Sequence, residues 1–244
     1  LTRLYLAWGK SLSLFLPLAL FMALTQISVN LLVTYLPQKA NLLPVKMLLG
    51  LGLGVLFLII MIALFAKAAG YVYQKPLSNL QSLELGIKKL PAWLATIILA
   101  TLMLALPFFI SLSLFESSFI FLRILGIFVM LSSFILGLYL SAIFPLVILE
   151  NTAPWTAIAE SFRLVNKRFG LTLIYFICVD LTYAVVAAFF VTLVYALENW
   201  INAFLLEQAI TVISYIFLYP FMMLSYIVLY TTLKPEAVPV NLMR

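Results

Sequence analysis

The stretch that decides the fold is residues 119–169, which read FIFLRILGIFVMLSSFILGLYLSAIFPLVILENTAPWTAIAESFRLVNKRF. Its first part, residues 119–149, carries a single charged side chain, that of Arg123. A helix needs about 20 apolar residues to cross a hydrocarbon core about 30 Å thick, so this run predicts a membrane span. The amphipathic residues that follow predict a second, shorter kind of helix beside the membrane.

The same apolar character extends over all 244 residues. Hydrophobic residues make up 66% of the chain and charged residues 9%, against about 45–50% and about 25% in soluble domains. This composition excludes a soluble enzyme. It predicts an all-α fold, a single integral membrane domain over residues 1–244 with six transmembrane helices at 11–36, 47–73, 92–117, 119–149, 170–197 and 203–233.

The chain has few side chains of the kinds that carry out catalysis or bind metals. The chain has no histidine and one cysteine, Cys178. Metal sites of the His/Cys kind, Ser-His and Cys-His pairs and an internal disulfide are therefore excluded by counting. We expect no catalytic residues, no metal site and no cofactor.

The basic residues predict the orientation. With six spans both termini share a side, and basic loops stay cytoplasmic. One side collects eleven basic residues and the other three, so both termini are predicted to be cytoplasmic. The net charge of +6 then reflects this bias and attraction to anionic lipid headgroups, and no nucleic-acid partner is expected. The eleven are Arg3, Lys10, Lys67, Lys75, Lys88, Lys89, Arg163, Lys167, Arg168, Lys234 and Arg244, and the three are Lys39, Lys46 and Arg123.

Residues 78–90 predict the first of two cytoplasmic interfacial helices. Apolar residues recur there at helical spacing, with polar ones on the opposite face. Ser78 and Gln81 form a capping-box pattern, and Glu84 with Lys88 an i,i+4 ion pair. Such a helix is expected to lie in the headgroup plane, as an elbow between two spans.

Residues 154–169 predict the second elbow helix. Pro154 suits its first turn. Its apolar stripe is Trp155, Ile158, Phe162, Val165 and Phe169. The side chains expected to anchor the two elbow helices to the membrane surface are Trp155, Phe162, Lys88, Lys89, Lys167 and Arg168.

The two elbow helices resemble each other at an offset of 79 residues. QSLELGIKKL, residues 81–90, aligns without gaps with ESFRLVNKRF, residues 160–169. One interpretation is an internal parallel repeat with units at 47–117 and 119–197, flanked by the spans 11–36 and 203–233. The other is that two interfacial helices converge on one pattern because they share the same environment. The ungapped match favours the repeat.

A family resemblance rests on the second elbow. The stretch FPLVILE at 144–150, then Pro154-Trp155 and SFRLV with Arg168-Phe169, resembles the membrane domain attached to some bacterial glycerophosphodiester phosphodiesterases and the related YciC-like inner-membrane proteins. The resemblance implies an architecture and a bacterial inner membrane. In that family the catalytic part is a separate soluble domain, so no catalytic residue carries over.

A few polar residues lie inside the spans. Asp180 is the only acidic residue deep within one, with Tyr215 and Tyr219 at a comparable depth in the sixth span. A proton relay or cation site is one interpretation, and a protonated, hydrogen-bonded structural Asp is the favoured one. Gln26, Asn30 and Thr34 form an i,i+4,i+8 stripe on the first span that faces either other helices or a wet cavity, and interhelical hydrogen bonding is the favoured role.

Small residues form two ridges at helical spacing. Gly50 and Gly54 lie on the second span, and Ser133, Gly137 and Ser141 on the fourth. Such ridges let two helix backbones approach closely. They predict helix packing either within the chain or between copies of it.

These features favour a non-catalytic integral membrane protein. We expect a scaffold or accessory subunit acting through lipid and other membrane proteins, or through self-association. The alternative is a secondary transporter or permease of a small solute, with Asp180 at a midplane site.

Overall fold

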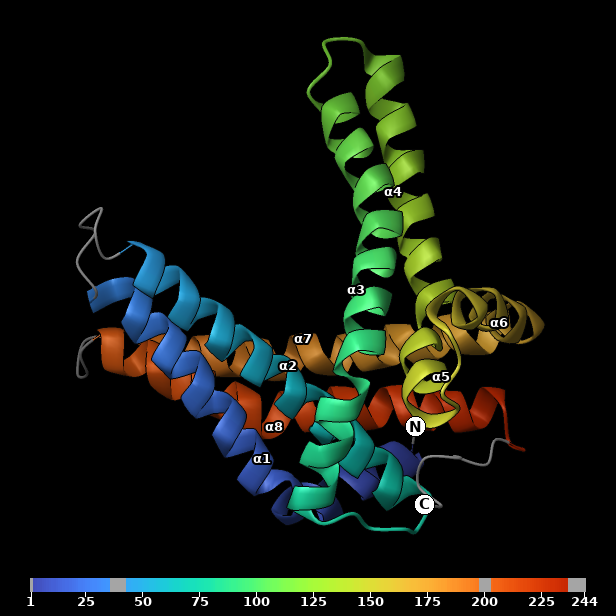
Figure 1. Cartoon of the computed structure of the whole chain (residues 1–244). Helices are drawn as coiled ribbons and strands as arrows, with labels where there is room; N and C mark the ends of the chain where they lie inside the picture. Colours follow the sequence, from blue (N-terminus) through green and yellow to red (C-terminus); the bar gives the residue numbers. More distant parts are fainter. Residues whose placement is uncertain (1, 36–42, 198–202, 237–244) are drawn as a thin grey trace. The chain divides into compact units, whose positions relative to one another are not determined.

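The computed structural model describes residues 2–35, 43–197 and 203–236, which form eight α-helices and no strand (Figure 1). Six helical segments are long and apolar enough to cross a membrane. The predicted fold class, an all-α polytopic membrane protein, is confirmed. The helices are α1 (Thr2–Tyr35), α2 (Leu43–Val72), α3 (Asn79–Phe115), α4 (Ile120–Leu140), α5 (Ile143–Leu149), α6 (Pro154–Lys167), α7 (Phe169–Leu197) and α8 (Ala203–Leu233).

The six candidate spans agree with the predicted ones to within a few residues at most ends. The main difference at a boundary is that α3 begins at Asn79, whereas the third span was predicted to begin at 92. Of the residues in the charge count, Lys39 and Arg244 lie outside the described part of the chain, as do the side chains of Arg3 and Lys10. The predicted orientation stays a prediction.

The chain divides into two compact units. The first unit comprises Leu1–Leu90 and Ile177–Val228, and the second Pro91–Phe176 and Leu229–Arg244. The divisions fall inside α3, α7 and α8. The repeat units proposed from the 79-residue offset remain a prediction.

In the first unit α2 packs against α1 and α8. Its buried residues run almost without interruption from Ile60 to Ala69, as expected for a helix enclosed by others. From α1, the Trp8 indole N–H donates to the carbonyl of Phe217 in α8 at 3.1 Å. The start of α3 lies against α2 at Gly86, where an added Cβ would stand 2.6 Å from the carbonyl oxygen of Ile59.

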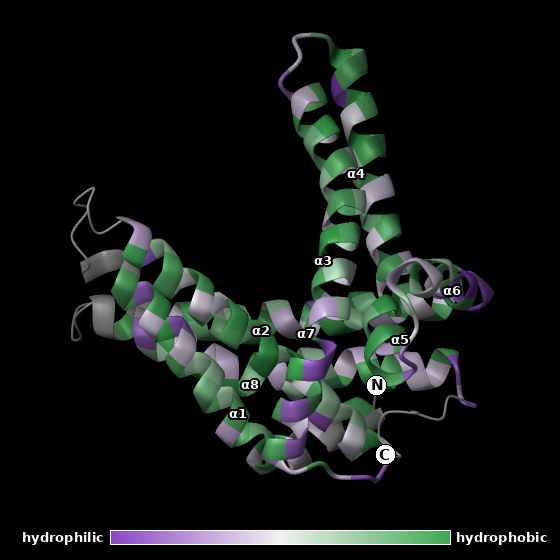
Figure 2. Cartoon of the chain, viewed as in Figure 1, coloured by the Kyte–Doolittle hydropathy of each residue, from purple (hydrophilic) through white to green (hydrophobic). Residues whose placement is uncertain are grey.

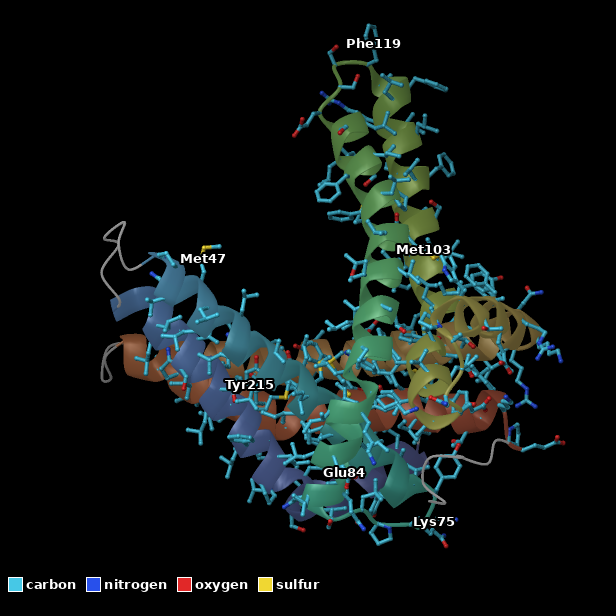
Figure 3. The ribbon with its side chains drawn as sticks, viewed as in Figure 1. Met47, Lys75, Glu84, Met103, Phe119 and Tyr215 are labelled. Carbon is cyan, nitrogen blue, oxygen red and sulfur yellow. The ribbon has the colours of Figure 1, made fainter. Side chains whose placement is uncertain are left out.

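In the second unit α3 and α4 form a hairpin with Phe119 at its tip (Figure 3). Gly126 lets the two backbones approach, because a Cβ there would lie 3.2 Å from the carbonyl oxygen of Ser111. Below the hairpin, six of the seven residues of α5 are buried, and α6 packs on both α4 and α5. Figure 1 shows α6 lying across the end of α4.

The first elbow helix differs from the prediction in one respect. Residues 79–90 are helical, but they form the first part of α3, which continues past Pro91 to Phe115. Pro91 removes one backbone donor, and the helix continues through it without a break. The second elbow helix is a separate element, α6, as predicted.

Candidate functional site

The fourth span is interrupted at Ser141 and Ala142, between α4 and α5. Pro145 explains the break. Its nitrogen has no hydrogen to donate, and its ring crowds the carbonyl four residues earlier, that of Ser141. A proline inside a span is expected to kink the helix, and here the helix ends at Leu140 and restarts at Ile143.

Ser161 of α6 fills the break. Its side chain is fully buried. The Ser161 hydroxyl donates to the carbonyl of Tyr139 at 2.5 Å and accepts the N–H of Ala142 at 3.1 Å. Two backbone groups at the break are therefore satisfied by one side chain from a neighbouring helix. This contact fixes α6 to the end of α4.

The rest of α6 is buried on one face. Pro154 is in its first turn, as predicted. The buried residues are Ala157, Ile158, Ser161, Leu164 and Val165. Trp155, expected on the same apolar stripe, is 68% exposed. The buried face of α6 is therefore rotated slightly from the predicted apolar stripe. The contacts of α6 with α4 and α5, as well as the hydropathy of its residues, determine which side chains are buried.

Aromatic rings from three helices meet beside α6. The Tyr139 ring stacks against the ring of Phe162, at a centroid distance of 4.8 Å, and against that of Phe169, at 5.7 Å. Its hydroxyl donates to the side-chain oxygen of Asn166 at 3.2 Å. A hollow of about 460 Å³ opens here, lined by Tyr139, Phe162, Arg163 and Asn166.

A charged network lies next to this hollow. The Lys234 ammonium contacts a Glu150 oxygen at 2.7 Å and a Glu160 oxygen at 2.9 Å, and the Tyr230 hydroxyl donates to Glu150. The network ties the end of α8 to α5 and α6. Partial burial alone would lower the pKa of Lys234, but the hydrogen bonds and charges of both glutamates outweigh it and raise that pKa.

The cations near α6 have different surroundings. Arg168 donates to the carbonyl of Thr232 at 2.7 Å, so it serves the link to α8. Arg163 is 68% exposed and has one ion pair, 3.6 Å from Glu160. Lys167 is exposed. Figure 2 shows hydrophilic colouring at the outer end of α6.

The anchors predicted on the first elbow differ from one another. Lys88 is exposed and pairs with Glu84 at 2.7 Å, which confirms the predicted ion pair. Lys89 is only 8% exposed, so it is not available as a headgroup contact. The predicted capping box is also confirmed, since Ser78 and Gln81 exchange hydrogen bonds of 3.0 and 3.2 Å.

The polar residues predicted near the membrane midplane have different surroundings in the structure. Asp180 is exposed on α7. Tyr215 and Tyr219 instead stack on each other at 4.5 Å, with the Phe57 ring edge-on to both. The structure thus gives these tyrosines a packing role between α2 and α8.

Gln26 and Asn30 form a hydrogen bond of 3.3 Å along their own helix, α1. The favoured prediction for them was a bond to another helix. Each satisfies part of the hydrogen-bonding capacity of the other, as i,i+4 amide pairs do. The described residues give the pair no role beyond this local one.

The residues of the two small-residue ridges differ in what they contact. Among the described residues, a Cβ at Gly50 or Gly54 would meet nothing within 4 Å, so none of them approaches these two glycines closely. A Cβ added at Gly137 would lie 3.9 Å from the Leu104 side chain of α3. Ser133 donates to a carbonyl of its own helix, and Ser141 is buried in the break between α4 and α5. The closest approaches between two helices at a glycine occur at Gly86 and Gly126, neither of which belongs to the predicted ridges.

Within the described ranges, no group of three or more His, Cys, Asp or Glu residues is placed to hold a metal ion. Comparison of the chain with protein-family models, with curated proteins and with solved structures gave no match.

Only some of the residues around α6 could be predicted from the sequence. Glu150 ends the FPLVILE stretch, and Ser161 and Asn166 belong to the aligned pattern. Tyr139 and Tyr230 carried no signal, because each contacts partners far away in the sequence.

Proposed function

We propose that this chain is a non-catalytic scaffold or accessory subunit of the bacterial inner membrane, acting through protein partners and lipid. The observation that carries the proposal is the attachment of α6. One face of this helix is fixed by Ser161 and four buried neighbours, while Trp155, Arg163 and Lys167 remain exposed. A rigid helix with exposed aromatic and cationic side chains suits docking to a partner or a membrane surface.

The length of α4 supports a surface position for α6. The 21 residues of α4 rise about 32 Å in a helix, enough to cross the hydrocarbon core alone. The apolar helix α5 is buried within the protein, so we take α4 as the part of the fourth span that crosses the core. Because α6 is fixed to the last turn of α4, it then lies at the membrane surface. The charged network of Glu150, Glu160 and Lys234 lies beyond it, on the side that the charge count predicts to be cytoplasmic.

That network supports a structural role. Lys234 is shared by two carboxylates and Glu150 also accepts from Tyr230. Each of these groups is engaged in linking α5, α6 and α8. None is arranged as a nucleophile with a neighbouring base.

The decisive experiment is mild detergent extraction of the tagged chain from native membranes, with identification of co-purifying proteins. A Trp155→Asp, Lys167→Glu double variant should lose the partner, because both side chains are exposed on α6. The matched control is Leu80→Asp, which changes a residue that is 77% exposed on the first part of α3. Equal retention of the partner by both variants would contradict docking through α6.

The alternative function, transport of a small solute, depends on Asp180. We expect the Asp180→Asn variant to fold normally, since Asn matches a protonated Asp in shape and hydrogen bonding. If the purified wild type instead mediates ion-dependent solute uptake in liposomes and Asp180→Asn abolishes it, the scaffold proposal is overturned.

The orientation is tested by cysteine labelling in a Cys178→Ser background. A membrane-impermeant reagent applied from outside should label cysteines placed at Lys46 and Arg123. It should spare those at Lys88 and Lys167. The reverse pattern would place α6 on the outer face.

A further inference from the structure

The hollow beside α6 combines an apolar wall with unused hydrogen-bond donors. Its wall consists of the stacked Tyr139 and Phe162 rings, and Arg163 and Asn166 complete its lining. All four residues belong to the second unit. The hollow is therefore a property of one compact part of the molecule.

Asn166 is oriented by its neighbour. The Tyr139 hydroxyl donates to the Asn166 side-chain oxygen, which leaves the amide NH₂ group as a donor. Among the described residues no hydrogen-bond acceptor is assigned to that NH₂ group. It is a fixed donor at the edge of the hollow.

Arg163 supplies a second set of donors and a positive charge. Its ion pair with Glu160 is long, at 3.6 Å, and the same Glu160 oxygen is held by Lys234 at 2.9 Å. Most of the guanidinium is thus free to bind an anion. Lys167, one residue beyond Asn166, adds a further exposed positive charge.

These donors suit a phosphate group, because a guanidinium matches its oxygens in geometry and charge. The ring wall suits the apolar part of the same ligand. The depth argument given for α6 places the hollow where phospholipid headgroups lie. A free phosphate ion would leave the aromatic wall unused.

We propose that this hollow binds one anionic glycerophospholipid. Arg163 and Asn166 donate to the phosphate oxygens, and Tyr139 and Phe162 pack against the glycerol and the first acyl carbons. The inference rests on the proposed position of α6 at the membrane surface, and it adds a specific ligand to the proposed function.

The test is native mass spectrometry of the purified, delipidated chain, titrated with phosphatidylglycerol, with phosphatidylcholine or with inorganic phosphate. The wild type should retain one phosphatidylglycerol more tightly than phosphatidylcholine. The Arg163→Gln and Asn166→Leu variants should each bind phosphatidylglycerol about tenfold more weakly, as expected for the loss of a charge-assisted or fixed hydrogen bond. Arg123→Gln, which removes a guanidinium from the far end of the hairpin, should bind like the wild type.

Three outcomes would overturn the inference. One is equal binding of both lipids by the wild type. Another is unchanged binding in both the Arg163 and Asn166 variants. The third is full displacement of phosphatidylglycerol by millimolar phosphate, which would assign the hollow to a free anion. Partner co-purification is a separate measurement from lipid binding. A failure of the lipid site would therefore leave the scaffold proposal standing, and a failure to co-purify a partner would leave the lipid site standing.

Discussion

Segments 81–90 and 160–169 align at an offset of 79 residues. The two segments are attached to their neighbouring helices by different means. Each contains a fully buried serine at the aligned position, Ser82 and Ser161. The Ser82 hydroxyl donates to the carbonyl of Ser78, the residue just before its own helix. The Ser161 hydroxyl instead bridges two backbone groups of another helix.

The difference originates in the preceding span. Pro145 interrupts the fourth span and exposes backbone groups that need a partner. The aligned residue in the second span is Ala66, and α2 is continuous there. With no break to fill, the first segment approaches α2 through Gly86, whose aligned partner is Val165. A shared sequence pattern thus indicates a shared helix, while the neighbouring span decides how that helix is attached.

The largest effect is expected from Gly86→Val, which installs the residue found at the aligned position. Its Cβ would stand 2.6 Å from the Ile59 carbonyl oxygen, so the two helices must separate. We expect a loss of about 3 kcal/mol in stability, at the upper end for overpacking. Thermal unfolding in detergent measures it. Gly52→Ala is the control, since a Cβ there meets nothing within 4 Å. Equal stability of the two variants would show that the contact with Ile59 is unimportant.

Ser161→Ala should come next, because it leaves the Tyr139 carbonyl and the Ala142 N–H without this partner. The cost expected for stranding buried backbone groups is about 1–3 kcal/mol. Ser82→Ala should cost less, since the Ser78 carbonyl still accepts the Ser82 backbone N–H at 3.0 Å. Combining Ser161→Ala with Pro145→Ala sharpens the test. If the serine serves the break, its loss should cost less in that background, where the helix can continue.

Lys234→Met tests the charged network beside the second segment. We expect a loss of about 1–2 kcal/mol at neutral pH, between the values typical of exposed and buried ion pairs. The raised pKa of Lys234 adds a pH signature. The stability that the charged Lys234 side chain contributes to the folded state is complete below the ordinary lysine pKa of 10.5. This stability is lost as the pH rises through the higher pKa that Lys234 has in the folded state. Wild-type stability should therefore fall more steeply than that of the variant above this pH. Parallel alkaline curves would contradict the link.

The smallest effect is expected from Lys88→Met on the first segment. The Lys88–Glu84 pair is 68% and 62% exposed, and such pairs are screened by water and salt. Unfolding temperatures of the variant and the wild type should coincide. A loss as large as that of Lys234→Met would mean that both segments depend on ion pairs.

Local features of this chain could be predicted from its sequence. The six spans follow from composition, because a residue that faces lipid must be apolar over a length fixed by the membrane. The Ser78–Gln81 cap and the Glu84–Lys88 pair join residues three and four positions apart, so helix geometry alone brings them together. The amphipathic α6 and its initial proline were predictable for the same reason.

Only the tertiary structure decided which of these helices touch, and through which atoms. Ser161 meets Tyr139 across 22 positions, and Lys234 meets Glu150 across 84. Gly50 and Gly54 fit a packing ridge better than Gly86 does, yet Gly86 is where two backbones meet. In a chain that is apolar nearly throughout, hydropathy barely distinguishes one helix face from another. The contacts are instead set by shape and by the backbone groups that a proline leaves without partners, and both depend on segments far apart in the sequence.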